Sequence, residues 1–333
     1  MPEPTNLGAA EFHAIAERAL PYWGLKPARI ELVANAENCV FRVEMPDSRA
    51  YVLRIHRPGY HSLTELESEL EWVRALADAG ISVSVGRPTL DGRAYAEVPT
   101  PDGESSRFVG LIDWTEGQIL DDEIELESDP DRIAARFEQI GRIAARIHNQ
   151  ASLWSPPPGF VRHEFDVPGF VGESPFWGRF WDVPVLRPEQ RAILLRARDG
   201  VANYLGGYGK DPGIYSMIHS DLHPRNFVVT ASGDLHVIDF DDAGFGWHQY
   251  ELATVLWELE GEPGFEEVRQ ALLTGYRSLR PISDEAVALI PLFLVIRSLA
   301  SIGWRWERPD LGRGATIPQL VDEACRSVVA FGF

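Results

Sequence analysis

The spacing of hydrophobic residues predicts that the first third of the chain is a small β-sheet carrying one long helix. Two short apolar runs, 38–44 and 50–56, flank the turn sequence MPDSR, which favours a β-hairpin. Apolar residues recur at helical spacing along 62–78, and Gly80 follows as a stop signal. The other segments expected in this part are a helix at 9–20 and strands at 29–34, 93–98 and 107–113.

After residues 114–118 the hydrophobic pattern becomes that of a mostly helical protein. Helices are expected at 130–151, 188–205, 249–260, 264–279, 284–303 and 316–331. Residues 154–184, rich in Pro, Gly and aromatics, predict an ordered irregular loop, and 231–234 predict a hairpin turn. We therefore expect an α+β chain with a β-rich N-terminal lobe (1–113), a hinge (114–118) and a larger, mostly helical C-terminal lobe (119–333).

Composition and charge exclude several classes of protein. The 333 residues carry 31 Lys and Arg against 50 Asp and Glu, a net charge of −19, which argues against nucleic-acid binding and suits a cationic small molecule. Two cysteines, Cys39 and Cys325, are too few for a disulfide framework, and Cys39 is expected to be buried and inert. The N-terminus lacks the features of a signal peptide, and the longest apolar run is 286–296. We expect a soluble, cytoplasmic protein that binds neither membrane nor nucleic acid; the sequence leaves its oligomeric state open.

The polar residues that suggest chemistry lie at 218–243. They are His219, Asp221, His223, Asn226, Asp239, Asp241 and Asp242. A short hairpin between the two polar clusters returns the chain, so Asp239 is expected close to Asn226. Their amide and carboxylate oxygens suit Mg²⁺. Asp221, at the start of the same loop, is placed to act as a base toward a hydroxyl group.

This pattern resembles the catalytic core of the protein-kinase-like superfamily, H-x-D-x-x-x-x-N followed by a hairpin and an Asp-Phe-Gly-like motif. Here the first motif is HSDLHPRN and the second is IDFD. His223 and Asp241 at their positions are typical of the aminoglycoside phosphotransferase and choline kinase branch. Within that branch the chain looks most similar to the bacterial stress-response kinase and homoserine kinase groups. The resemblance implies a bilobal protein-kinase-like fold.

The resemblance also implies roles for individual residues. Asp221 would be the catalytic base, with His219 bracing the loop and His223 beside it. Asn226 and Asp239 would hold Mg²⁺, and Asp241 or, alternatively, Asp242 would bind a second metal. Arg54 stands in place of the family's phosphate-binding lysine, and Glu69 would pair with it. Asn38 lies in the turn that replaces the glycine-rich loop. The nucleotide would be ATP, with GTP as an alternative.

Several interpretations stay open. The favoured acceptor is a small molecule: an amino alcohol, amino sugar, aminoglycoside or homoserine-like compound. A stress-response-type Ser/Thr protein kinase is the alternative, although only about ten residues separate Asp239 from the next helix. More distant readings are a catalytically inactive kinase fold used for binding, and a metal-dependent hydrolase that uses His219, Asp221 and His223.

Side chains outside the motif have structural interpretations that compete with functional ones. Glu251, Glu258 and Glu260 are expected on a solvated helix face, and His148 as a last-turn cation or a packed side chain.

Overall fold

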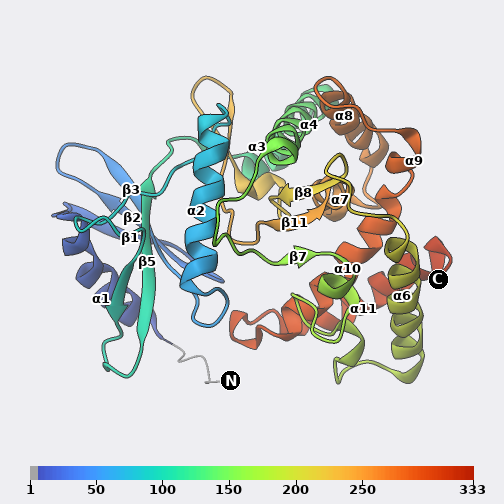
Figure 1. Cartoon of the computed structure of the whole chain (residues 1–333), viewed down its shortest axis with the longest axis horizontal. Helices are drawn as coiled ribbons and strands as arrows, with labels where there is room; N and C mark the ends of the chain where they lie inside the picture. The colour runs from blue at the N-terminus through green and yellow to red at the C-terminus, as the bar shows by residue number, and fades with distance from the viewer. Residues whose placement is uncertain (1–6) are drawn as a thin grey trace. The chain divides into compact units, whose positions relative to one another are not determined.

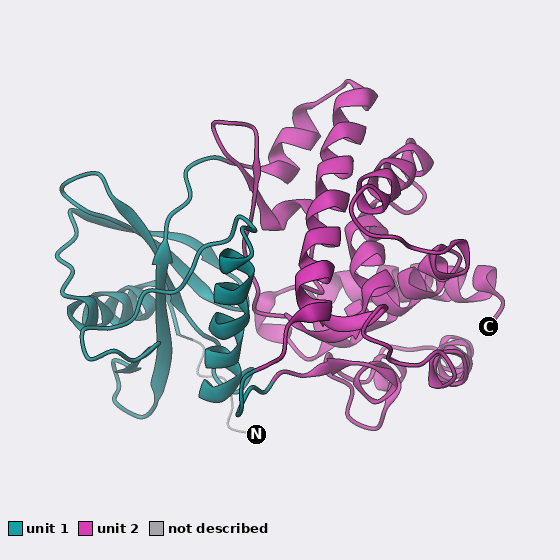
Figure 2. Ribbon diagram, turned by 45° about the horizontal axis from the view of Figure 1, so that its top comes forward, with its two compact units in different colours: residues 1–117, 157–161 teal, residues 118–156, 162–333 magenta. Residues whose placement is uncertain are grey.

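The computed structural model describes residues 7–333 and divides into two compact units (Figures 1 and 2). Unit 1 runs to Gly117 and also takes Pro157–Val161. Unit 2 comprises Gln118–Pro156 and Arg162–Phe333. The roles of lobe and hinge assigned to 1–113, 114–118 and 119–333 remain a prediction.

Unit 1 is an antiparallel sheet of five strands, in the order β1-β2-β3-β5-β4, with helices on both faces (Figure 1). Burial alternates along β2 and β3, so one face of each strand contributes to a core that α1 covers. The elements are α1 (Ala9–Ala19), η1 (Leu20–Trp23), β1 (Arg29–Asn35), β2 (Cys39–Glu44), β3 (Ala50–Ile55), α2 (Leu63–Asp78), β4 (Ala96–Pro99) and β5 (Ser106–Asp113).

The helix predicted at 62–78 is present as α2, with Ser62 as its cap. The Ser62 side chain and Glu65 form a capping box that satisfies free amides of the first turn. Gly80 follows the helix with a φ of 78°, the left-handed conformation that ends the helix and favours glycine. Cys39 is buried as expected, and burial raises the pKa of its thiol to about 12.

Unit 2 is mostly helical, with two small three-stranded sheets. Its strands are β6 (Gln118–Ile119), β7 (Glu164–Phe165), β8 (Tyr215–Ile218), β9 (Phe227–Val229), β10 (Leu235–Val237) and β11 (Gly244–Trp247). Its α-helices are α3 (Leu120–Leu126), α4 (Pro130–Leu153), α5 (Val167–Val171), α6 (Pro188–Gly206), α7 (His248–Leu256), α8 (Phe265–Arg277), α9 (Asp284–Val287), α10 (Ile290–Trp306) and α11 (Ile317–Phe331). The 3-10 turns are η2 (Phe180–Asp182), η3 (Pro224–Asn226), η4 (Trp257–Leu259), η5 (Pro309–Leu311) and η6 (Gly314–Thr316).

Three expectations about secondary structure in unit 2 need correction. The helix expected at 284–303 is two helices, α9 and α10, because Pro291 lacks an amide hydrogen and stands in the first turn of α10. The helix expected at 249–260 ends at Leu256 and continues as the 3-10 turn η4. The irregular loop expected at 154–184 contains β7, α5 and η2. The predicted hairpin turn is confirmed, with Gly233 at a φ of 84° between β9 and β10.

The apolar segment Asp284–Trp306 is long and hydrophobic enough to cross a membrane by length and composition alone. However, 61% of its most apolar window is buried within the structure, where α10 packs against α7 and α11. Such burial is typical of the core helix of a globular unit.

Helices α4 and α8 approach closely because each has a glycine at the contact. A Cβ atom on Gly141 would lie 2.0 Å from the carbonyl oxygen of Leu272, and one on Gly275 would lie 2.0 Å from that of Glu138. Neither backbone oxygen can move without its helix, so only glycine fits at these two positions.

We predict that Gly141→Ala destabilises the protein by roughly 2–3 kcal/mol, because the added methyl group forces the two helices apart. Urea unfolding followed by circular dichroism measures the change. Gly206→Ala is the control, since nothing lies within 4 Å of its Cβ position and alanine favours the helix. Equal stability of the two variants would contradict the close-contact account.

Candidate active site

The loop that carries Asp221 follows strand β8 and is fixed by a buried carboxylate. Glu251 of α7 is completely buried and accepts the backbone amides of His219 at 2.9 Å and Ser220 at 2.6 Å. Ser220 has a φ of 66°, a left-handed conformation that is rare outside glycine and costs about 1–3 kcal/mol. Its hydroxyl donates to the carbonyl of Asp242 at 2.7 Å. This bond joins the catalytic loop, residues 219–226, to the metal motif, the segment 239–242 that is expected to bind metal.

The Asp221 carboxylate is held by three donors. Arg297 Nη2 lies 2.5 Å from Oδ1, while His223 Nε2 and Asn226 Nδ2 each lie 3.1 Å from Oδ2. Burial raises the pKa of Asp221, but the positive charges of His223 and Arg297 outweigh burial and hold it well below its usual range. The carboxylate is therefore ionised at neutral pH, as a proton acceptor must be.

The hairpin β9–β10 brings the two polar clusters together as predicted. The amide of Ile238 donates to the carbonyl of Asn226 at 3.0 Å, which places Asp239 next to the catalytic loop. His219 is completely buried and its Nε2 donates to the carbonyl of Ile238 at 2.9 Å, while its Nδ1 accepts the amide of Asp221 at 3.3 Å. Both ring nitrogens are thus used to brace the loop.

The donor set near this hairpin fits a hard cation such as Mg²⁺. Asn226 uses its Nδ2 on Asp221, so its amide oxygen is the atom that would contact a cation. Asp239 is exposed, with a φ of 63°, and Asp241 is buried. Within residues 7–333, no three His, Cys, Asp or Glu side chains are grouped so that they could hold a metal ion by themselves. This geometry argues against the hydrolase reading, as does the engagement of both His219 nitrogens.

Arg162, from the segment before β7, also holds the metal motif by its backbone. This buried guanidinium donates to the carbonyls of Ala243 and Asp241, each at 2.5 Å. The next residue, His163, contacts the carbonyl of Asp242 at 3.0 Å and stacks on Phe176. The segment predicted as an irregular loop is therefore part of the framework of the site.

One expectation about a side chain in this region is wrong. Glu251 does not lie on a solvated helix face, since it is buried beneath the catalytic loop. Of the two interpretations of His148, the packed side chain is confirmed and the last-turn cation is not: α4 continues to Leu153, and burial lowers the pKa of His148 well below its usual value, so it is neutral. Its Nδ1 lies 2.8 Å from the hydroxyl of Tyr276 and its ring stacks on His248, which supports α7 from below.

The residues expected at the nucleotide lie in unit 1. Arg54 of β3 and Glu69 of α2 form an ion pair at 3.5 Å, and both side chains are largely buried, which confirms the predicted pairing. The neighbouring acids are used elsewhere, Glu65 in the helix cap and Glu71 with Arg74. Asn38 closes the turn between β1 and β2, where its side-chain oxygen accepts the amide of Arg57 at 3.1 Å.

Sequence analysis missed Glu251, Arg162 and Arg297 as parts of the site. Arg297 had a usable signal, because a single charge inside the apolar run of α10 must be paired when it is buried. Glu251 had none, because it is one of three glutamates in a short stretch. Arg162 comes from a segment without a regular pattern.

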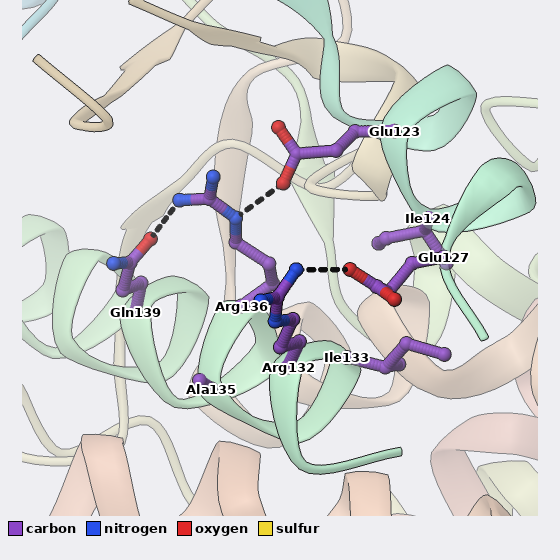
Figure 3. A pocket seen from close by; sticks show the side chains of 8 residues that line it. All are labelled: Glu123, Ile124, Glu127, Arg132, Ile133, Ala135, Arg136 and Gln139. Atoms are coloured by element: carbon purple, nitrogen blue, oxygen red, sulfur yellow. Dashed lines mark hydrogen bonds and ion pairs between the residues drawn. The ribbon is translucent and has the colours of Figure 1, made fainter. Parts of the chain in front are cut away.

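A cavity of about 290 Å³ lies beside α3 and α4 in unit 2 (Figure 3). Its charged side chains pair with one another, Arg136 with Glu123 at 2.7 Å and Arg132 with Glu127 at 3.4 Å. Arg136 also donates to the carbonyl of Gly233 in the β9–β10 turn. We interpret the paired side chains that line this cavity as a structural support for the β9–β10 hairpin.

Comparison with known proteins agrees with this geometry. Residues 29–286 match the model of the Phosphotransferase enzyme family. Amicoumacin kinase of Bacillus subtilis (strain 168) is 27% identical over 90% of this chain and 86% of its own length. Homoserine kinase of Rhizobium rhizogenes is 25% identical over 65% of this chain and 61% of its own. The structure of a microcompartment-associated aminopropanol kinase has a TM-score of 0.80 and 30% identity, covering 94% of this chain and 95% of its own.

These findings confirm the family resemblance and the α+β protein-kinase-like fold expected from the sequence. The match spans most of the chain, and the relatives are kinases of small molecules. The chain therefore belongs to the Phosphotransferase enzyme family and is a kinase with an alcohol group as acceptor.

Proposed function

We propose that the protein transfers the γ-phosphoryl group of ATP to the hydroxyl of a small amino alcohol, with Asp221 as the base. The observation that carries this proposal is the placement of an ionised Asp221 beside Asn226, whose backbone is bonded to the residue before Asp239. One loop thus holds the proton acceptor and the oxygen ligands for a metal, as phosphoryl transfer to an alcohol requires.

In the proposed reaction, Asp221 orients the acceptor hydroxyl and accepts its proton as the new bond to the γ-phosphorus forms. The bond between that phosphorus and the bridging oxygen breaks, and ADP leaves. Asn226 and Asp239 would hold Mg²⁺, which neutralises charge on the phosphates when bound. Arg54, fixed by Glu69, would bind the nucleotide phosphates, and Asn38 would shape the turn above them. ATP is the proposed donor and GTP the alternative.

The segment after the metal motif favours a small acceptor over a protein. In protein kinases a long activation segment follows this motif and shapes the peptide site. Here β11 follows almost at once, pairs with β7 and β8, and leads directly into α7 at His248. Little free chain remains to bind a peptide, which weighs against a stress-response-type protein kinase.

The choice of amino alcohol rests on the comparison with the aminopropanol kinase, which is similar over nearly the whole of both chains. The net charge of −19 is compatible with such a cationic acceptor. Homoserine and aminoglycoside-type acceptors are the next candidates. A reaction on a metabolite of this kind suits the cytoplasm, where we place the protein.

We predict that the wild-type protein forms ADP from ATP and Mg²⁺ only when a suitable acceptor is present. Asp221→Asn should lower kcat roughly 100- to 10,000-fold, because the proton acceptor is lost. A coupled ADP assay across 1-amino-2-propanol, ethanolamine, choline, homoserine, kanamycin and a generic protein measures both effects.

Asp234→Asn is the matched control for that assay. Asp234 belongs to the same stretch of chain, but its side chain lies in the exposed hairpin turn and accepts from Ser232. The activity of Asp234→Asn should equal that of the wild type.

Acceptor-dependent ADP formation that persists in Asp221→Asn would contradict the assignment of the base. The proposed function would be contradicted if no acceptor increased ADP formation and if ATP with Mg²⁺ did not stabilise the protein.

We predict that Glu251→Ala lowers stability by roughly 2–5 kcal/mol, because the two buried amides of the catalytic loop lose their acceptor. The kcat should fall roughly 100-fold through misplacement of Asp221. Chemical denaturation and the ADP assay measure these changes. Glu260→Ala, an exposed position on the next turn, should change stability by less than about 0.5 kcal/mol. Full activity of Glu251→Ala at a temperature where it is folded would disprove the positioning role.

A further inference from the structure

Arg297 is the one strong contact of Asp221 that comes from outside the catalytic loop. It projects from the middle of α10, a helix that is otherwise apolar over most of its length. Its side chain is 13% exposed, and its guanidinium is 5.2 Å from the ring centre of Trp177 and 5.6 Å from that of Trp257. The contacts with the two rings restrict the movement of the group, which helps to hold its Nη2 toward Asp221.

The contacts of Asp221 leave one acceptor position open. An ionised carboxylate offers about four lone-pair positions, two on each oxygen. Oδ2 accepts from both His223 and Asn226, whereas, among residues 7–333, Oδ1 accepts only from Arg297. The remaining lone pair is therefore on Oδ1, the oxygen that Arg297 holds.

We infer that Arg297 is a positioning residue for phosphoryl transfer, which orients the Asp221 carboxylate so that Oδ1 receives the proton of the acceptor hydroxyl. This inference rests on the proposed function of Asp221 as the base. The acceptor oxygen then lies within reach of the guanidinium as well, because both bind the same carboxylate oxygen. Without Arg297 the carboxylate can turn about its last bond, and the hydroxyl loses a defined partner.

The bond from Arg297 also limits what Asp221 can become during the reaction. An arginine bound to Oδ1 keeps a positive charge throughout, since guanidinium does not lose its proton in proteins. As Oδ1 takes up the hydroxyl proton, the pair changes from an ion pair to an arginine beside a neutral acid. The proton then passes to solvent after ADP and the phosphorylated alcohol leave, so atoms and charge balance.

A merely structural role for Arg297 makes a different prediction. The side chain fills the space between two tryptophans, so its removal leaves a gap in the packing whatever its effect on Asp221. Loss of packing alone would lower stability without a selective effect on kcat. A small guanidinium ion that enters the gap would restore the contact with Oδ1 but not the covalent link to α10.

The test is Arg297→Ala assayed with and without added guanidinium ion at millimolar concentrations. We expect kcat to fall about tenfold or more, the KM for ATP with Mg²⁺ to stay within about twofold, and guanidinium to restore at least part of kcat. Urea at the same concentration is the solvent control, because it has a similar shape and no charge. Arg297→Lys should keep part of the activity, since it retains the charge but not the planar fork.

Arg198→Ala is the matched control variant. Arg198 also lies over a tryptophan, Trp181, at 4.2 Å, and pairs with a carboxylate, Glu173, at 2.7 Å. Its kcat should match that of the wild type and should not respond to guanidinium. A kcat for Arg297→Ala within twofold of the control, or a loss that guanidinium does not reverse beyond urea, overturns the inference.

A second measurement needs no catalytic turnover and therefore separates this inference from the proposed function. It is a double-mutant cycle of melting temperatures, which uses Arg297→Ala, Asp221→Asn and the double variant. We expect the melting temperature of the double variant to fall by clearly less than the sum of the two single decreases, because the pair is broken only once. Strictly additive losses would overturn the positioning role even if the wild-type enzyme proves to be a kinase.

Discussion

The buried carboxylate of Glu251 is the contact on which the rest of the site depends. It satisfies two amides of a loop that turns through a left-handed residue, Ser220, and that conformation persists only where its surroundings enforce it. A buried acid is itself costly, and burial raises the pKa of Glu251. Its cost is offset by the two hydrogen bonds from the amides of His219 and Ser220. The helix α7 thus holds the loop of Asp221 by its backbone, and the contact with Glu251 uses no side chain of that loop.

Three further hydrogen bonds, here called links, place the remaining parts of the site relative to this loop. The His219 ring donates to the carbonyl of Ile238, the Ser220 hydroxyl to that of Asp242, and the Arg162 guanidinium to that of Asp241. Each link uses a backbone carbonyl as acceptor, and two of the donors, the His219 ring and the Ser220 hydroxyl, are side chains of the motif itself. None of these three links uses the carboxylate of Asp221 or Asp239, the proposed base and metal ligand.

Much of this could be predicted from the sequence, and the limits have physical causes. The hairpin, the helix α2 with its Ser62 cap and the pairing of Arg54 with Glu69 follow from local patterns or from motif spacing, and they are confirmed. The start of α10 at Ile290, with Pro291 in its first turn, was also encoded locally, but the apolar pattern running through 284–303 masked it. Glu251 and Arg162 could not be assigned, because each acts on residues distant in the sequence, and only tertiary packing decides whether a charged side chain is buried. The lone charge of Arg297 in an apolar run indicated a buried pair, but its partner Asp221 is equally distant in the sequence.

The structure also qualifies the electrostatic argument made from composition. A net charge of −19 describes the whole chain, whereas Asp221, the proposed base, already lies against Arg297 and His223. We therefore expect the affinity for a cationic acceptor to come from groups other than Asp221. Overall charge guides approach to the protein, and the few contacts around Asp221 decide the chemistry.

The central claim is that Asp221 acts as a base in one direct transfer and never carries the phosphoryl group itself. The most direct measurement is the configuration at phosphorus in the product when the donor is ATP made chiral at its γ-phosphorus with oxygen isotopes. A single in-line displacement predicts inversion. Retention would contradict the account, because it requires two displacements through a phosphorylated side chain such as Asp221 or His223.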